Sequence, residues 1–360
     1  MEKAIDLFEI DVISAGKDQT LAMLKSGEVL GWGGAGSGRY VPPYTDICGA
    51  FKGSDPRSVY ISEPSYYSDI SAGYGISLGV SNKRPFVWGF NQISMGSNES
   101  ISEVPSVIAN LTSANSVVAG KFLFALINEA SNIYTWGLNI DGALGRNTSQ
   151  INAFPAIISG IPPMQEVVIG DNFMLALSHD QKVYAWGSNS SGQLGLGHLN
   201  TVIKPELVDL PFKIKGLAVG STHVLALTID GKVYGWGSNN FKQSGNTSQP
   251  FITRPKQILF SEPITAISAG MHYSLSLSST GNVFAWGWNG LGQLGLGDVQ
   301  SRSNPVRISD LLGVRAITAG EMHAVAIGKN HLYGWGSNAS NQIGKAELRQ
   351  ITPNPFLQIA

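Results

Sequence analysis

The sequence of 360 residues is poor in charge, in cysteine and in long apolar runs. Only 14% of its residues are charged, about half the usual ~25%, which disfavours long salt-bridged helices and charged disordered tails. Its 24 Lys and Arg balance 25 Asp and Glu, so the clustered basic charge required by nucleic acid or an anionic membrane is missing. A single cysteine, Cys48, excludes an internal disulfide and a multi-thiolate zinc site. Since no uncharged apolar stretch reaches 18 residues, we also expect no membrane-spanning helix.

Glycine and tryptophan, by contrast, form a repeat along the whole chain. A Trp-Gly pair recurs at spacings of 56, 48, 50, 50, 50 and 49 residues, at Trp32, Trp88, Trp136, Trp186, Trp236, Trp286 and Trp335. A second glycine lies 15 or 16 residues before each tryptophan, at Gly16, Gly73, Gly120, Gly170, Gly220, Gly270 and Gly320. A period near 50 is typical of repeat architectures in which each unit packs against its neighbours.

Each repeat has the pattern of short β-strands. Residues 166–187 alternate with period 2 around a polar turn. The position seven residues after the upstream glycine is always apolar: Met23, Val80, Ile127, Leu177, Leu227, Leu277 and Ile327. The position before it is small in six of seven repeats, as closely packed sheets require. A further strand containing proline follows each loop, and proline is tolerated at an outer edge.

These observations predict an all-β chain, a seven-bladed β-propeller of four-stranded antiparallel blades formed by residues 1–360 as one domain. The first repeat begins at its inner strand and lacks a recognisable outer one, whereas residues ~351–359 look like an outer strand with no repeat after them. We therefore expect the C-terminal strand to pair with the blade of residues ~8–33 and to close the ring.

The loops after Trp-Gly identify a family. Residues 188–197 read Ser-Asn-Ser-Ser-Gly-Gln-Leu-Gly-Leu-Gly, and residues 288–297 read Trp-Asn-Gly-Leu-Gly-Gln-Leu-Gly-Leu-Gly. With the Ala-Gly-x-x-His and Val-Tyr-x-Trp-Gly-Ser-Asn segments, they resemble the regulator of chromosome condensation family. The resemblance covers essentially the whole chain and implies protein binding more firmly than any chemistry. Its founding member is a nucleotide exchange factor for the small GTPase Ran and binds chromatin. Other relatives are plant photoreceptors, ubiquitin-ligase modules, ciliary scaffolds, secreted β-lactamase inhibitors and bacterial effectors.

Motifs for catalysis and for cofactors have structural explanations. Gly75-x-Ser77-x-Gly79 matches a nucleophile elbow, but Ser77 falls inside a predicted strand. Gly31-x-Gly33-x-x-Gly36 opens a loop rather than the helix that a dinucleotide needs. His223 and His323 share a repeat position that elsewhere holds Ile or Phe, so we interpret both as packing residues. The sequence thus predicts no catalytic residue, no metal site and no cofactor.

Departures from the repeat are the candidates for function. An insertion at about residues 34–67 lengthens the first spacing, and it is rich in tyrosine. Aromatic residues and arginine are enriched at binding hot spots, although some of these side chains could instead pack the second blade. The candidates for partner binding in this segment are Arg39, Tyr40, Tyr44, Asp46, Phe51, Asp55, Glu63, Tyr66 and Tyr67.

A second departure is the residue after Trp-Gly. It is serine in three repeats but Phe90, Leu138 and Trp288 in others. If this position lies on the loop face, these side chains could bind a partner, and Trp288 could instead pack under its own loop.

Two functions follow from these expectations. The first is guanine-nucleotide exchange on a small GTPase, Ran being the first candidate, because in the founding enzyme a wedge projecting from one blade helps to displace nucleotide. The insertion here would play the comparable role without any bond-making catalysis. The second is a non-enzymatic scaffold or inhibitor that binds an unrelated protein. In both cases we expect a monomeric propeller in the cytoplasm or in nucleus and cytoplasm, or, for a bacterial effector, in a host cytoplasm.

Overall fold

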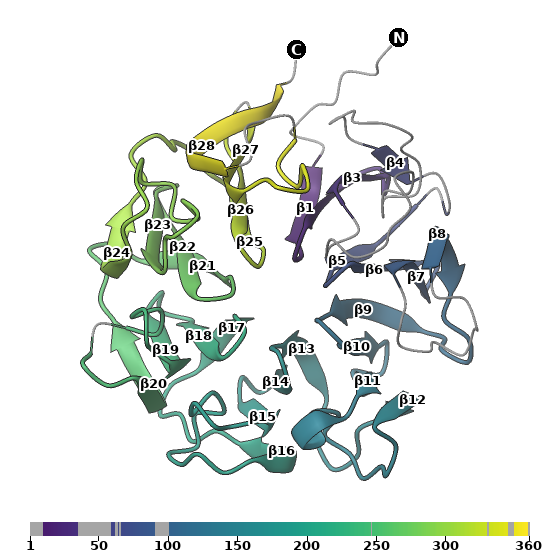
Figure 1. The fold of residues 1–360 in the computed structure, drawn as a ribbon. Helices are drawn as coiled ribbons and strands as arrows, with labels where there is room; N and C mark the ends of the chain where they lie inside the picture. Colours follow the sequence, from purple (N-terminus) through teal and green to yellow (C-terminus); the bar gives the residue numbers. More distant parts are fainter. Residues whose placement is uncertain are drawn as a thin grey trace.

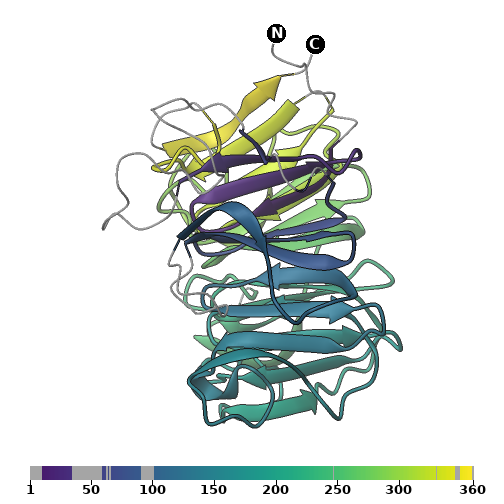
Figure 2. The same ribbon diagram turned by 90° about the vertical axis from the view of Figure 1, so that its right-hand side faces the viewer.

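Each repeat folds into one four-stranded antiparallel sheet, and the seven sheets are arranged around a central axis (Figure 1). The computed structural model describes residues 10–34, 59–61, 64, 66–90, 101–245, 247–329, 331–344 and 349–358. Turned by 90°, the molecule is a disc whose strands are stacked blade upon blade (Figure 2). Among the described residues, no helix is long and apolar enough to cross a membrane.

The blades contain the same four strands in chain order, from the axis to the rim. The innermost strands are β1 (Ile10–Ala15), β5 (Asp69–Ala72), β9 (Ala114–Ala119), β13 (Met164–Ile169), β17 (Ile214–Val219), β21 (Ile264–Ala269) and β25 (Ala316–Ala319). The second strands are β2 (Gln19–Leu24), β6 (Ile76–Ser81), β10 (Leu123–Asn128), β14 (Phe173–Ser178), β18 (His223–Thr228), β22 (Tyr273–Ser278) and β26 (His323–Ile327). The third strands are β3 (Val29–Gly33), β7 (Arg84–Phe90), β11 (Ile133–Leu138), β15 (Val183–Gly187), β19 (Val233–Ser238), β23 (Val283–Gly287) and β27 (His331–Ser337). The outer strands are β4 (Val59–Ile61), β8 (Ile101–Val107), β12 (Asn152–Ile157), β16 (Val202–Leu207), β20 (Phe251–Ile258), β24 (Arg302–Arg307) and β28 (Arg349–Gln358). A short 3-10 helix, η2 (Ile140–Gly142), lies in the loop of the third blade.

The predicted apolar column is confirmed as core. All seven of its residues, from Met23 to Ile327, are buried. The small residues beside it are needed for close packing: a Cβ on Gly79 would lie 2.6 Å from the ring of Tyr67. The upstream glycines have the same role at the axis, since a Cβ on Gly220 would lie 2.2 Å from the carbonyl oxygen of Gly270 in the next blade.

The repeated tryptophans join neighbouring blades. The indole Nε1–H of Trp186 donates to the carbonyl of Ala143, 2.9 Å away in the preceding blade, and Trp236 donates to Gln193 at 3.0 Å. Trp286 and Trp335 make the equivalent bond at 2.9 Å. These four tryptophans therefore fill blade junctions and satisfy their single donors there, whereas the buried Nε1 of Trp88 has no hydrogen-bond partner among the described residues.

The expected mode of ring closure is wrong. β28 pairs with β27 of its own blade, and the outer strand of the first blade is β4, which pairs with β3. Among the described residues, the first strand is thus an innermost one and the last strand an outer one, and the two belong to different blades. The error arose because β4 is only three residues long, lies inside the lengthened spacer and lacks the proline found in the other six outer strands.

The first and seventh blades are joined by packing and by hydrogen bonds between inner strands. Ile10 and Trp32 belong to the same apolar cluster as Val325 of the seventh blade. The amide of Ala15 donates to Thr318 Oγ1 at 3.1 Å. Closure therefore uses the same kind of contact as the other junctions.

Candidate functional site

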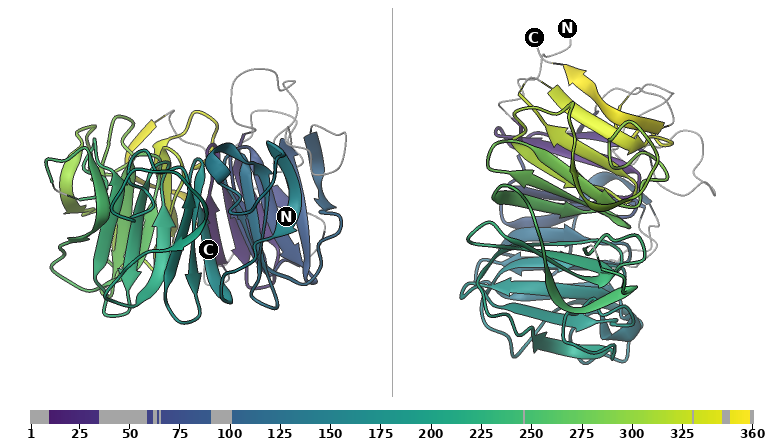
Figure 3. Two further views of the ribbon diagram at one scale, coloured as in Figure 1. Left: turned by 90° about the horizontal axis from the view of Figure 1, so that it is seen from below. Right: turned by 90° about the vertical axis from the view of Figure 1, so that its left-hand side faces the viewer.

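The two faces of the disc differ in what they carry. The loop after each third strand begins beside the turn that follows the innermost strand, because the amide of Leu138 donates to the Phe122 carbonyl, that of Ser188 to Asn172 and that of Trp288 to His272, at 2.8–2.9 Å. We call this side the mouth face. The opposite side, the hairpin face, carries the turns between second and third strands. Figure 3 shows the disc from two further sides, with loops projecting from both faces.

The hairpin face is regular. In its turns Ser178 and Thr228 accept from the amides of Lys182 and Lys232 at 3.1 and 3.0 Å, and each lysine also pairs with an aspartate of its own turn. Such turns stabilise hairpins, and the fourth and fifth blades use the same chemistry.

The centre of the mouth face opens into a cavity of about 140 Å³ on the propeller axis. Its lining includes the residue that directly follows each upstream glycine. These seven mouth residues are Lys17, Tyr74, Lys121, Asp171, Ser221, Met271 and Glu321. Seven positions about 50 residues apart in the sequence thus meet at one place, and each contributes a different side chain except for the two lysines.

Backbone hydrogen bonds hold the mouth residues in a ring. The amide of Lys17 donates to the carbonyl of Gly73 in the next blade at 3.1 Å, and the amide of Glu321 donates to Gly16 at 3.0 Å across the closure. Equivalent bonds run from Tyr74, Asp171, Ser221 and Met271. Because the backbone makes these bonds, the mouth side chains are not needed to close the ring.

A basic arc occupies the first three blades. Lys17 Nζ donates to the Tyr74 hydroxyl at 2.5 Å and lies 3.9 Å from the centre of that ring, while Lys121 Nζ lies 5.1 Å from it. Asp18 pairs with Lys17 at 3.7 Å. Burial lowers the pKa of Lys17, but the bond to Tyr74 and the charge of Asp18 outweigh it and raise the pKa overall.

Acidic groups occupy the remaining arc. Burial raises the pKa of Asp171, against the opposing effects of Lys121 and a hydrogen bond from Ser221. Burial also raises the pKa of Glu321, with Lys17 and Lys121 opposing it. Neither carboxylate has an ion-pair partner within 4.0 Å among the residues whose positions are described. The arc from the fourth to the seventh blade therefore carries two carboxylates without a direct ion pair, and the lysines of the neighbouring blades act on them at longer range.

An aromatic cluster lies beside the acidic arc, on the fifth and sixth blades. The ring of Phe241 lies 5.4 Å from His272 and 6.2 Å from Trp288, centre to centre. Phe241 is 37% exposed. Burial lowers the pKa of His272, so its imidazole is neutral near pH 7, although the charge of Asp171 opposes the shift.

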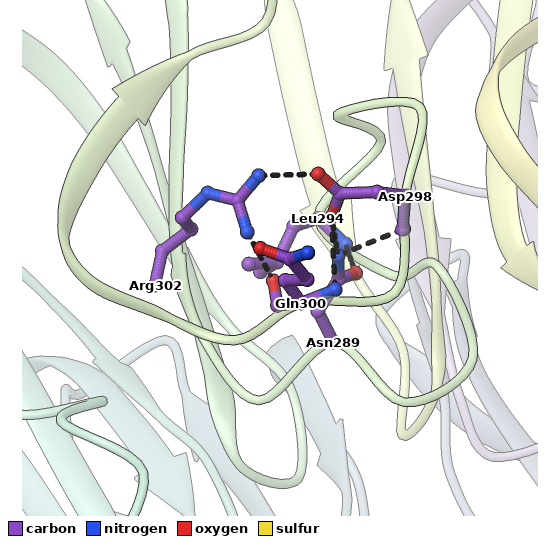
Figure 4. Close-up of polar contacts among 5 residues, drawn as sticks. All are labelled: Asn289, Leu294, Asp298, Gln300 and Arg302. Atoms are coloured by element: carbon purple, nitrogen blue, oxygen red, sulfur yellow. Dashed lines mark hydrogen bonds and ion pairs between the residues drawn. The ribbon is translucent and has the colours of Figure 1, made fainter.

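The loops of the mouth face are held by a repeated network. In the sixth blade, Asn289 Oδ1 accepts from the amide of Leu294 at 2.9 Å, and its Nδ2 donates to the Asp298 carbonyl at 2.9 Å (Figure 4). Asp298 Oδ2 pairs with Arg302 Nη2 at 2.5 Å, and Gln300 donates its amide to Asp298 Oδ1 at 2.8 Å. This network fixes the loop that carries Trp288.

Most sequence-based candidates of the insertion lie outside the described residues. These are Arg39, Tyr40, Tyr44, Asp46, Phe51, Asp55 and Glu63. Tyr66 is 51% exposed and lies over Gly27 of a hairpin-face turn, so it is on the side opposite the mouth. Tyr67 is only 1% exposed and packs against Phe86 and Trp88. Tyr67 is therefore a core residue, as the alternative interpretation of packing in the second blade predicted, and its side chain has almost no exposed surface for a partner.

The residues after Trp-Gly do not form one cluster. Leu138 is partly buried and packs on the core between the second and third blades. Trp288 lies in the sixth blade, against Phe241 and against Gly290 of its own loop. The side chain of Phe90 lies outside the described part of the chain.

The residues interpreted as structural are confirmed as such. His323 Nε2 and Thr20 Oγ1 lie 3.0 Å apart across the closure, and His223 Nε2 pairs likewise with Ser274 Oγ. Burial lowers the pKa of His223 to about 3 and that of His323 to about 4. Ser77 lies inside β6 and donates to Gln19 Oε1 at 3.3 Å. Within the described ranges, no group of three His, Cys, Asp or Glu side chains could hold a metal ion.

Sequence reasoning missed the mouth residues. The signal is the variable column directly after the upstream glycine, but variation from repeat to repeat does not by itself distinguish a binding position from an unconstrained one. The aromatic cluster was missed because Phe241 and His272 belong to different repeats.

Comparisons with known proteins agree with this fold. The profile of the RCC1-like domain matches residues 84–359. No curated protein sequence matches the chain. The crystal structure of human WBSCR16 superposes with a TM-score of 0.77 at 22% identity, covering 84% of each chain. Prp20p from Saccharomyces cerevisiae superposes with a TM-score of 0.76 at 21% identity, covering 89% of this chain and 82% of that one. The CRINKLY WD40 ectodomain of the Arabidopsis thaliana receptor kinase ACR4 superposes with a TM-score of 0.56 at 16% identity, covering 95% of this chain and 98% of that one.

Proposed function

The chain belongs to the RCC1-like family, and from this premise we propose that it binds a small GTPase through the mouth face and accelerates the release of its nucleotide. Ran is the first candidate. The observation that carries the proposal is the mouth itself, where seven side chains of six chemical types meet on a backbone ring that does not need them. The structure of Prp20p, similar in fold, was described together with its binding to Gsp1p and histones.

Exchange needs no bond-making group. A protein that binds the nucleotide-free state of a GTPase more tightly than the nucleotide-bound state shifts the equilibrium by that difference in affinity. A rigid face with acidic and basic arcs suits this task, because complementary charges set orientation and association rate. Lys17, Lys121, Asp171 and Glu321 are the residues we expect to make these contacts.

The test is release of fluorescent GDP from purified Ran, Rab, Rho and Arf proteins, with the full chain at catalytic amounts. We expect acceleration for one class. Lys121→Glu should reduce it by about 30-fold, the effect of losing one interface hot spot of about 2 kcal/mol.

Lys182→Glu is the matched control, since Lys182 is an exposed lysine of the hairpin face. It should leave exchange unchanged. Intrinsic release rates with every GTPase would contradict exchange activity, and equal losses in the two variants would move the contact away from the mouth.

A further inference from the structure

The surface over the fifth and sixth blades combines features that match one kind of side chain. Phe241, His272 and Trp288 provide aromatic surface on the fifth and sixth blades, and Asp171 and Glu321 come from the blades before and after them. We propose that this surface, the arginine site, binds an arginine side chain of the protein partner. The inference rests on the proposed protein-binding function and specifies the chemistry of the partner at one point.

Charge complementarity selects a cation. Between Asp171 and Glu321 the mouth residues are Ser221 and Met271, both uncharged. The lysines of the mouth lie on the first and third blades, where Tyr74 and Asp18 already contact Lys17. With Asp18, which pairs with Lys17 beside the cavity, this region has three carboxylates and two ammonium groups, a formal excess of one negative charge.

The aromatic cluster selects arginine over lysine. A guanidinium is planar and weakly hydrated, stacks on an aromatic face and can still donate sideways to a carboxylate. Phe241 presents such a face, and its neighbour His272 is close enough to Asp171 for their charges to interact. His272 is neutral near pH 7 and does not repel the ligand.

The site is built rather than formed on binding. The amide of Phe241 donates to Gln243 Oε1 at 3.0 Å, which fixes the loop of the fifth blade. The amide of Trp288 donates to the His272 carbonyl at 2.9 Å, which ties the aromatic residues of the sixth blade together. A fixed surface reduces the entropy lost on binding. Lys242, which follows Phe241 in the loop, is the nearest cation in sequence.

In the experiment, the full chain is labelled with 5-fluorotryptophan, and peptide binding is followed by 19F NMR. The Trp288 resonance is assigned by its loss in Trp288→Phe. The probes are three capped tripeptides, glycine-X-glycine, in which X is arginine, lysine or citrulline, the last being the uncharged analogue of arginine with nearly the same shape.

We expect the arginine peptide to shift the Trp288 resonance saturably, the lysine peptide to bind more weakly and the citrulline peptide to bind at least about tenfold more weakly. Phe241→Ala should weaken arginine-peptide binding about fivefold, which corresponds to about 1 kcal/mol for one cation–π contact. Asp171→Asn should weaken it as well and reduce its salt dependence. Phe154→Ala, which removes a phenylalanine 56% exposed on β12, is the control and should change nothing.

Equal binding of citrulline and arginine, no saturable shift, or unchanged affinity in Phe241→Ala and Asp171→Asn would each overturn the arginine site. Its failure is distinguishable from failure of the proposed function. Peptide binding without any GTPase response would leave the arginine site in place and remove GTPase regulation, whereas exchange without peptide binding would do the reverse.

Discussion

Glu166 makes the stability of the propeller depend on pH in an unusual direction. Its carboxylate lies in β13 and accepts from the amide of Leu217 in the next blade at 3.2 and 3.4 Å. Burial nevertheless raises the pKa of Glu166 from 4.5 to about 7, because the single backbone bond does not compensate for lost hydration. A carboxyl whose pKa is higher in the folded state stabilises the fold below pH 4.5, and this stabilisation is lost as the pH rises through about 7.

The size of the effect follows from the shift. A difference of about 2.5 pH units corresponds to about 3 kcal/mol, and solvent that reaches the partly exposed side chain reduces it to between about 1 and 3 kcal/mol. Unfolding entropy of about 2.1 cal/mol/K per residue gives about 0.8 kcal/mol/K for this chain. Glu166→Gln removes the ionisation, so its melting temperature relative to wild type should rise by about 1–4 °C between pH 4 and pH 8.

The assay is differential scanning fluorimetry of wild type and Glu166→Gln across that range. Taking the difference between the two proteins cancels the titration of His223 and His323, whose lowered pKa values act in both. Glu262→Gln is the control of opposite sign, because hydrogen bonds from Thr280 and Asn282 lower the pKa of Glu262. The melting temperature of Glu262→Gln relative to wild type should fall as the pH rises. A Glu166→Gln difference that is flat from pH 4 to pH 8 would refute the reasoning.

Three further predictions concern the blade junctions. Trp335→Phe leaves the Gln293 carbonyl without its 2.9 Å donor and should cost about 2 kcal/mol, seen as a melting temperature lower by about 2–3 °C; an unchanged value would mean that the bond contributes nothing. Thr20→Val removes the partner of the fully buried His323 and should cost about 1–3 kcal/mol in urea unfolding, and wild-type stability would argue against this closure contact. Gly220→Ala should abolish soluble expression, since its Cβ would lie 2.2 Å from a neighbouring carbonyl, whereas Gly216→Ala, whose nearest atom is 3.9 Å away, should be tolerated; similar yields would contradict the packing argument.

Much of the fold could be predicted from the sequence because each blade repeats the same pattern of glycine, tryptophan and alternating apolar residues. Trp-Gly and the upstream glycine fix the number of blades and the place of the inner strands, and alternation fixes which side chains are buried. The way the ring closes could not be predicted. Spacing gives the order of strands but not which blade the last one joins, and β4 is too short to leave a pattern.

The candidate site was less accessible to sequence reasoning. The insertion and the residues after Trp-Gly were chosen because they depart from the repeat, yet Tyr67 fills the core and Tyr66 faces the hairpin side. A residue that departs from the repeat shows only that the repeat does not require one residue type at that position. Whether its side chain is buried depends on neighbouring blades, which the repeat pattern does not reveal. Asp171 and Glu321, 150 residues apart, become neighbours of one cavity only when the ring closes.

The position of the mouth residues explains why polar and charged side chains of different types are found there rather than in the strands. Two columns close to each mouth residue have structural roles. The preceding glycine allows inner strands to approach, and two positions after the mouth residue, side chains such as that of His323 bond to the next blade. The mouth residue itself contributes its backbone to the ring and leaves its side chain for other use. Substitutions there should therefore change binding with little loss of stability, whereas substitutions of the upstream glycines and of residues such as His323 should lower stability. Ser221→Ala and Met271→Ala, with unfolding and peptide binding measured on the same samples, separate these two outcomes.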